Sequence, residues 1–109
     1  MTVKELTMLP AFTEVLLPDP DREIEGCYVG DLLSWVMGRA QSGDAWITIM
    51  SNVNVLAVAT LADVCCVILA EGVKLDDEVL KVASEKEINV LSTELPMYEG
   101  SLALAEALR

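Results

Sequence analysis

One stretch near the middle of the chain constrains its fold more than any other. Residues 43–72 read GDAWITIMSNVNVLAVATLADVCCVILAEG, with β-branched segments at both ends and an alanine-rich apolar segment between them. Strands favour β-branched residues and helices favour alanine, so this order predicts a strand, a helix and a second, parallel strand. The apolar run 53–70 approaches the length of a membrane span, but Asn54, Thr60 and Asp63 interrupt it. We therefore expect no membrane crossing.

The alternation of strands and helices continues on both sides of this unit. Hydrophobic periodicity predicts helices at 2–9, 31–40, 53–62, 76–86 and 96–108, and strands at 12–17, 22–29, 45–50, 64–70 and 88–91. Short loops between such elements predict an α/β fold in three layers, α/β/α, with a mostly parallel sheet in the middle. The first two strands flank a turn at 19–22 and are expected to form an antiparallel pair. A chain of 109 residues suits one such domain, spanning residues 1–109.

The acidic excess of the chain narrows the range of its partners. The sequence contains 18 acidic residues, 7 basic residues and no histidine, which gives a formal charge of −11. Phosphate backbones and anionic lipids would be repelled, so neither nucleic acid nor a membrane surface is expected as a partner. A basic protein partner stays open.

The three cysteines, Cys27, Cys65 and Cys66, lack the spacing of a disulfide framework or a zinc site. Cys65 and Cys66 lie in a predicted strand, where adjacent side chains point to opposite faces, so they are not expected to bind one metal ion. We expect three buried, reduced thiols and no metal site. The amino terminus has no apolar run with a cleavage site, and a cytoplasmic location is predicted.

The predicted helix at 53–62 has almost no polar face. A helix that is apolar all round must be buried on all sides, and a chain of this length has few layers to bury it. We therefore expect a second copy of the chain to cover its outer face, most simply in a two-fold homodimer. The residues expected at this interface are Val55, Val58, Ala59 and Ala62.

Candidate ligand-binding residues follow from the predicted sheet, because ligands of α/β sheets bind beyond the carboxyl ends of the strands. The residues at those ends are Gly30, Asp31, Ser51, Asn52, Gly72 and Thr93. Their polar groups lie at predicted helix N-termini, where they favour anions but serve more often as helix caps. In the capping interpretation, Asp31 caps the second helix, and Thr93 or Ser92 caps the last.

No catalytic constellation is evident in the sequence. A nucleophile needs a base within hydrogen-bond reach, and the chain has no histidine and no phosphate-loop, dinucleotide or nucleophile-elbow motif. We expect no enzymatic activity and no cofactor; an enzymatic alternative would depend on Asp31, Ser51 or Asn52. Trp35 and Trp46 lie in apolar segments, which favours core packing over stacking on a ligand.

Several segments together resemble the DRTGG domain family. They are residues 26–29, 30–39, 43–50 and 67–72, followed by Asp77-Glu78-Val79-Leu80 and Ala83. In that family, a strand ending in a small-residue turn and a glycine precedes the same acidic, Glu-Val-Leu and Ala pattern. The resemblance covers nearly the whole chain and implies an α/β fold similar to the amino-terminal domain of HPr kinase/phosphorylase.

The resemblance also implies a class of function. Domains of this family accompany CBS domains in some pyrophosphatases and occur in some phosphate acetyltransferases, as regulatory or oligomerising modules. Short stand-alone members are similar to proteins of anaerobic bacteria found near redox and hydrogenase components. The residues of the family name are only partly present here, since Asp21-Arg22 is followed by Glu-Ile and no Thr-Gly-Gly exists. No role of those residues is therefore transferred.

These observations predict a non-catalytic, cytoplasmic regulatory or interaction module that forms a homodimer. It would serve a redox or metabolic system of an anaerobic bacterium, with a protein partner that the sequence does not identify. The alternative is a small-ligand sensor for a nucleotide or another anionic metabolite at the strand ends. That alternative meets a difficulty, because no basic residue in the proposed loops neutralises an anion.

Overall fold

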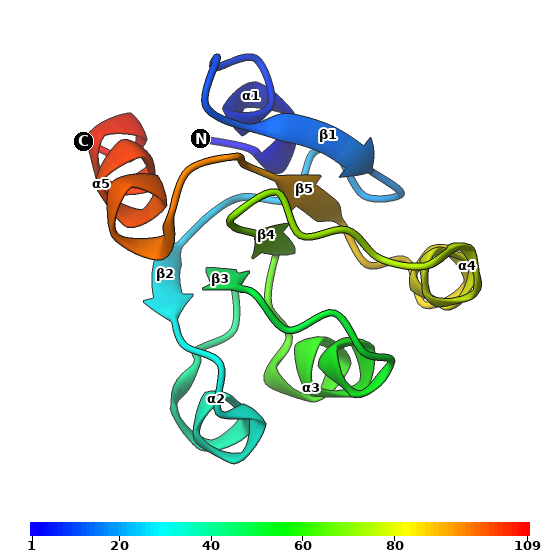
Figure 1. Cartoon of the computed structure of the whole chain (residues 1–109). Coiled ribbons are helices and arrows are strands. Elements are labelled where there is room, and N and C mark those ends of the chain that lie inside the picture. Colours follow the sequence, from blue (N-terminus) through cyan, green and yellow to red (C-terminus); the bar gives the residue numbers. More distant parts are fainter.

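A five-stranded sheet forms the centre of the protein (Figure 1). The computed structural model describes residues 1–109. In their order across the sheet, the strands are β1 (Thr13–Leu16), β5 (Val90–Ser92), β4 (Cys66–Leu69), β3 (Asp44–Thr48) and β2 (Gly26–Val29). The strands from β5 to β2 are parallel to one another, whereas β1 is antiparallel to β5. The predicted α/β fold with a mostly parallel sheet is therefore confirmed.

The first two strands do not pair with each other, so the predicted hairpin between them is wrong. β1 and β2 lie at opposite edges of the sheet, and the antiparallel partner of β1 is β5. Pro18 and Pro20 follow β1 and have no N–H groups to continue a hairpin ladder. The segment after them is held elsewhere: the main-chain nitrogen of Asp19 donates to the side chain of Asn89, at a distance of 2.9 Å.

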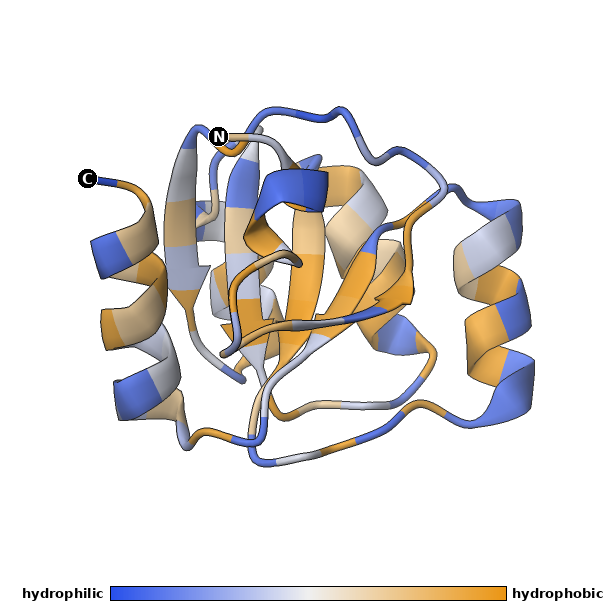
Figure 2. Cartoon of the chain, turned by 90° about the horizontal axis from the view of Figure 1, so that it is seen from above, coloured by the Kyte–Doolittle hydropathy of each residue, from blue (hydrophilic) through white to orange (hydrophobic).

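Five helices cover the two faces of the sheet (Figure 1). Helices α1 (Val3–Leu6) and α5 (Met97–Ala107) lie on one face, and α2 (Leu33–Arg39), α3 (Asn54–Ala62) and α4 (Asp77–Glu85) lie on the other. A separate hydrophobic cluster fills each interface between helices and sheet. Figure 2 shows that hydrophobic residues gather in the inner strands, whereas the outer helices carry both hydrophobic and hydrophilic residues. None of the helices combines the length and apolarity that crossing a membrane requires.

Helix α3 is apolar because it is the middle helix of its layer, between α2 and α4 (Figure 1). Val55, Val58 and Ala59 are buried within the chain itself, in the same cluster as residues of the sheet, α2 and α4. The outer surface of the helix carries Leu61, which is 69% exposed. The chain thus buries the inner face of this helix without a second copy. Three of the four predicted interface residues belong to its own core, and the fourth, Ala62, is half-buried.

Candidate functional site

The six residues predicted from the strand ends do lie along one edge of the sheet, where β2, β3, β4 and β5 end. Asp31 connects two of these ends. Its carboxylate accepts a 2.7 Å hydrogen bond from the hydroxyl of Thr48 and a 3.0 Å hydrogen bond from the main-chain nitrogen of Ile49. Asp31 was predicted to be the N-cap of helix α2, but the N-cap residue is Leu32, and no side chain caps the helix. It ties the loop after β2 to the end of β3.

The other polar residues of this edge bind their own loops. Asn52 accepts a 2.9 Å hydrogen bond from the main-chain nitrogen of Asn54, and Thr93 accepts a 3.2 Å hydrogen bond from that of Leu95. Helix α5 has Pro96 as its N-cap residue and no side-chain cap, so neither Ser92 nor Thr93 caps it. Ser51 makes no side-chain hydrogen bond within the chain. The contacts of Asn52 and Thr93 thus shape their own turns.

Gly72 has a left-handed backbone conformation, which favours glycine. Its φ is +69°, and a Cβ atom there would lie 2.5 Å from a carboxylate oxygen of Glu94. Its nitrogen donates a 3.0 Å hydrogen bond to the main-chain oxygen of Thr93, which holds the ends of β4 and β5 together. At the other end of the row, the main-chain oxygen of Gly30 accepts a 2.9 Å hydrogen bond from the buried indole of Trp46. Both glycines therefore have structural roles.

The largest hollow near this edge is lined by residues of strands β1, β4 and β5, of helix α4 and of the loop before it. We call it the α4 groove; its volume is about 420 Å³, within the usual range of small-molecule sites. Leu69, Ser92 and Thr13 lie along one side of it, and Lys74, Leu75 and Leu80 along the other. None of the six predicted residues lines this groove. Thr93 lines a separate hollow of about 360 Å³ near Pro10 and Glu94.

The sequence contained one signal for the α4 groove, but it could not predict the groove itself. Lys74 is a basic residue in the loop between β4 and α4, so the sequence did contain a cation close to the strand ends. That signal was available. Thr13 reaches the groove only because β1 pairs with β5, a contact between segments more than 70 residues apart. No local pattern predicts such a pairing.

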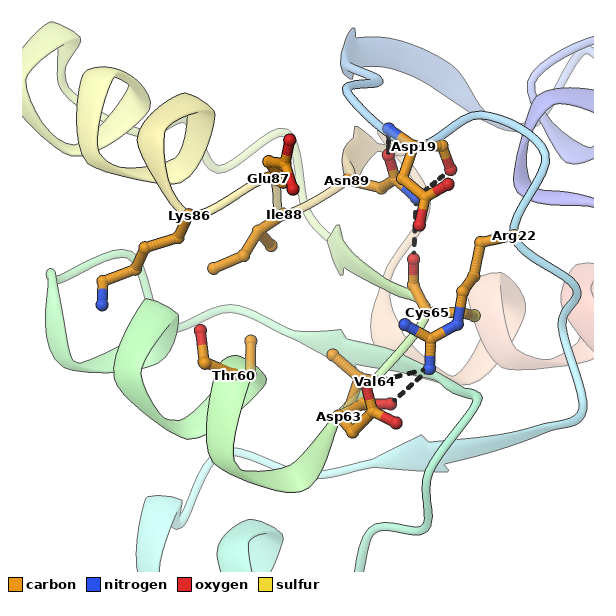
Figure 3. A pocket seen from close by; sticks show the side chains of 11 residues that line it. Asp19, Arg22, Thr60, Asp63, Val64, Cys65, Lys86, Glu87, Ile88 and Asn89 are labelled. Atoms are coloured by element: carbon orange, nitrogen blue, oxygen red, sulfur yellow. Dashed lines mark hydrogen bonds and ion pairs between the residues drawn. The ribbon is translucent and has the colours of Figure 1, made fainter.

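A smaller polar hollow of about 120 Å³ lies at the opposite edge, where β4 and β5 begin (Figure 3). Arg22 donates a 2.9 Å hydrogen bond to the main-chain oxygen of Asp63 and lies 3.1 Å from its carboxylate. The hydroxyl of Ser42 also donates to that carboxylate. The hydrogen bond from Ser42 and the charge of Arg22 lower the pKa of Asp63 below its ordinary value of 3.8. Arg22 and Asp63, on one side of the hollow, are therefore engaged in contacts that hold the fold together.

Asn89 reinforces the same edge from within. Its side chain is buried, donates to the main-chain oxygens of Asp19 and Cys65 at 2.7 and 2.9 Å, and accepts from the nitrogen of Asp19 (Figure 3). All its contacts are with main-chain groups, so it acts as a structural bridge between the segment after β1 and the segment before β4. It presents no free polar group to a ligand.

Two predictions about burial need correction. Trp46 is fully buried as expected, but Trp35 is 52% exposed on α2, where the guanidinium of Arg39 stacks over its ring at 3.7 Å. Of the cysteines, Cys65 and Cys66 are buried, whereas Cys27 is exposed on the edge strand β2. The reason is position, because β2 and α2 are the last strand and the last helix of their layers.

The side chains of Cys65 and Cys66 do not point to opposite faces of the sheet, as the sequence had predicted. Cys65 precedes β4 in a bend instead of continuing the strand, so both sulfur atoms lie in the same hydrophobic cluster, 3.9 Å apart. The hydrogen bond to Cys65 and complete burial raise the pKa of the Cys66 thiol well above its ordinary value. A buried thiol with a raised pKa is a poor nucleophile and a poor metal ligand.

Exposed hydrophobic side chains and charges are distributed unequally over the molecule. From residue 26 to residue 62, which covers β2, α2, β3 and α3, the only charged residues are Asp31, Arg39 and Asp44. We call this the neutral segment; it holds −1 of the total formal charge of −11. The large hydrophobic residues exposed within it are Val29, Leu32, Trp35, Met37, Ile49, Val53 and Leu61. The rest of the chain exposes fewer such residues and carries nearly all of the negative charge.

Comparison with known proteins identifies the family. A sequence model of the DRTGG domain matches residues 19–107. The chain belongs to the DRTGG domain family. Its fold is similar to that in the crystal structure of the CBS and DRTGG domains of the regulatory region of Clostridium perfringens pyrophosphatase complexed with activator, diadenosine tetraphosphate.

The similarity to the clostridial structure is one of fold. The TM-score is 0.68 at 13% sequence identity, and the match covers 96% of this chain and 45% of the clostridial one. The chain thus spans less than half the length of that relative. A search of curated proteins finds no match.

Proposed function

We propose that this protein is a non-catalytic regulatory module that acts as a homodimer, in which the neutral segments of two copies meet. The regulatory part is supported by the family and by the similar domains in a regulatory region. We further propose that residues 1–109 act as one domain in the cytoplasm, because β1 completes the sheet formed by the matched residues. Its system would be a redox or metabolic one with a protein partner still to be identified, which rests on the resemblance alone.

The distribution of charge carries the proposal of a homodimer. Two copies with a charge of −11 each repel one another, so they can approach only through a surface almost free of carboxylates. The exposed residues of the neutral segment would supply such a contact, and their hydrophobic side chains would lose water on association. The predicted residues Val55, Val58 and Ala59 are buried beneath it, so the contact would use their exposed neighbours.

Sedimentation equilibrium over a wide range of protein concentration tests this proposal. We expect a monomer–dimer equilibrium that salt strengthens, because salt screens the repulsion between acidic copies. Leu32→Glu and Leu61→Glu each introduce a charge into the neutral segment. Since burial of a leucine contributes roughly 1.5–3 kcal/mol, each substitution should weaken association by tenfold or more.

Leu102→Glu is the matched control, because Leu102 is an exposed leucine of α5 outside the neutral segment. It should leave the association constant unchanged. A monomer at all concentrations, or a dimer that Leu102→Glu weakens as much as the other two substitutions, would contradict the proposal.

A second candidate function is that of a small-ligand sensor. The α4 groove, with Lys74 beside the ends of β4 and β5, favours it and supplies the cation that the predicted loops lack. The similar clostridial regulatory region is also one complexed with an activator. A thermal-shift screen of nucleotides and small metabolites tests this candidate, because a ligand that binds only the folded state must raise the unfolding temperature.

A further inference from the structure

The base of the α4 groove is a row of three side chains across three strands. Leu69 of β4 pairs in register with Ser92 of β5, which pairs with Thr13 of β1. The hydroxyls of Ser92 and Thr13 make no hydrogen bond with any protein group, and neither is a buried unsatisfied atom. Two adjacent hydroxyls are thus free to bind a ligand at the centre of the groove.

Strand β1 is irregular beside this row. The register of β1 against β5 shifts between Glu14 and Leu16, which leaves Val15 as an additional residue in the strand. Bulges of this kind redirect side chains and are frequent next to binding sites. Val15 lines the groove and is 40% exposed, although the facing residues of β5, Val90 and Leu91, are fully buried.

The opposite wall is apolar and comes from the loop and helix that follow β4. Val73 and Leu75 belong to the loop, and Leu80 lies one turn into α4. With Leu69 and Val15, they line the groove with aliphatic side chains from three different parts of the chain. Such a lining accommodates the hydrophobic body of a small ligand.

Two charged groups without partners line the same groove. The ion pairs of the protein are Met1–Glu23, Lys4–Glu14 and Arg22–Asp63, and neither Lys74 nor Asp77 takes part in one. Neither side chain makes a hydrogen bond within the chain. Lys74 is therefore available for a carboxylate and Asp77 for an ammonium group. Glu14, also on the rim, is already paired with Lys4 at 3.3 Å.

The charge of the whole protein selects among ligands that these groups could hold. A polyanion would approach a molecule of charge −11 and find one unpaired cation in the groove, so its binding would be weak. A zwitterion carries no net charge and satisfies both Lys74 and Asp77. We propose that the α4 groove binds a zwitterionic amino acid with a hydrophobic side chain, an inference that rests on the second candidate function, ligand sensing.

Three related probes separate the contributions of the two charges. L-Phenylalanine has both charged groups, phenethylamine lacks the carboxylate, and hydrocinnamate lacks the ammonium group. Titrations of the isotope-labelled chain by NMR should show saturable shifts at Val73, Leu80 and Ser92 with L-phenylalanine. Both single-charge probes should bind more weakly by roughly tenfold, because a hydrogen bond to a charged group contributes about 1.5–3 kcal/mol.

Two substitutions assign the charges to residues. Lys74→Met should weaken the binding of L-phenylalanine by roughly tenfold and leave the binding of phenethylamine unchanged. Asp77→Asn should weaken the binding of L-phenylalanine and leave that of hydrocinnamate unchanged. Lys81→Met and Glu85→Gln are the controls, since both residues are exposed on α4 and neither lines the groove. All four positions are exposed, so folding should be preserved.

The outcomes distinguish this inference from the ligand-sensing function on which it rests. No shift at the groove with L-phenylalanine, or shifts that Lys74→Met and Asp77→Asn leave intact, would overturn it. If nucleotides stabilise the protein while amino acids do not, ligand sensing stands and the inference about the groove fails. The association of two copies is measured separately by sedimentation and depends on neither result.

Discussion

Arg22 and Asp63 are joined twice, by a hydrogen bond to the main-chain oxygen of Asp63 and by an ion pair with its carboxylate (Figure 3). Asp63 ends helix α3 in a left-handed conformation, with a φ of 58°, so its main-chain oxygen is turned away from the helix. That oxygen accepts a hydrogen bond from the guanidinium and another from the main-chain nitrogen of Gly43, each 2.9 Å long. The guanidinium also links the helix to the segment between β1 and β2. The contact therefore stabilises both a helix end and a long connection.

Replacing Asp63 with Asn should reduce stability in a pH-dependent way. The folded protein lowers the pKa of Asp63, so the ionised carboxylate contributes stability above its ordinary pKa of 3.8. That contribution disappears as the pH falls through the lower, folded value. Asp63→Asn should thus cost up to about 1 kcal/mol near neutral pH, as expected for an exposed pair, and less in acid.

Urea denaturation at several pH values measures this dependence, and Asp21→Asn is its control. Asp21 is an exposed aspartate in the same connection and has no ion pair. Asparagine tolerates the left-handed conformation, so Asp63→Asn tests the charge and not the backbone. A difference between Asp63→Asn and the original protein that stays constant down to acidic pH would contradict the role assigned to the carboxylate.

The two tryptophans should respond differently to replacement by phenylalanine. Trp46 is fully buried and donates a hydrogen bond to Gly30, so Trp46→Phe leaves a void and an unpaired carbonyl and should cost about 2–3 kcal/mol. Trp35 is half exposed, and Trp35→Phe should change stability by less than about 0.5 kcal/mol. Denaturant unfolding measures both.

Fluorescence checks the same assignment without relying on stability. In the Trp35→Phe variant, emission from Trp46 should be shifted to the blue and resist quenching by iodide. In the Trp46→Phe variant, emission from Trp35 should be quenched readily in the monomer. If two copies of the protein associate through the neutral segment, quenching of Trp35 should fall as the protein concentration rises.

The side chain of Asn89 should contribute more to stability than any exposed asparagine. It bonds to main-chain groups of Asp19 and Cys65, and Asn89→Ala removes all three of these hydrogen bonds between the two segments. The expected cost is about 2–3 kcal/mol. Asn54→Ala is the control, because the exposed side chain of Asn54 makes no hydrogen bond. Equal costs for both substitutions in denaturant unfolding would refute the bridging role.

Local sequence patterns were sufficient to predict the repeated strand–helix units. Residues 43–72 fold as the predicted β-α-β unit, because periodicity and composition act within a few residues of each position. The position of β1 depends instead on pairing with β5, far along the chain, and no local pattern specifies it. The order of the helices on that face explains why α3 is apolar, because it lies in the middle of three helices.

The candidate site was predictable only in part, for the same physical reason. The strand ends were located correctly, but polar residues such as Asp31 and Thr93 bind neighbouring loops, which sequence alone does not reveal. Lys74 could have been noticed, since it follows a predicted strand. Its groove could not, because Thr13 and Ser92 meet only after β1 joins the sheet. Exposure of Trp35 and Cys27 likewise depends on where the layers end.

Cys27 should be the one thiol that reacts in the folded protein. It is exposed, whereas Cys65 and Cys66 are buried. Partial burial and the nearby charge of Asp44 raise the pKa of Cys27 above its ordinary value of 9.0, so little thiolate is present at neutral pH. A thiol reagent such as dithionitrobenzoate should therefore modify it slowly, and the rate should keep rising with pH beyond the range of an ordinary thiol.

Counting modified thiols before and after unfolding checks this prediction. The native protein should release one equivalent of nitrothiobenzoate and the unfolded protein three, while Cys27→Ser should show no reaction until it unfolds. Asp44→Asn removes the neighbouring charge and should speed the reaction of Cys27 at neutral pH, because the thiolate is then easier to form. Rapid reaction of a second thiol in the folded chain would contradict the burial of Cys65 and Cys66.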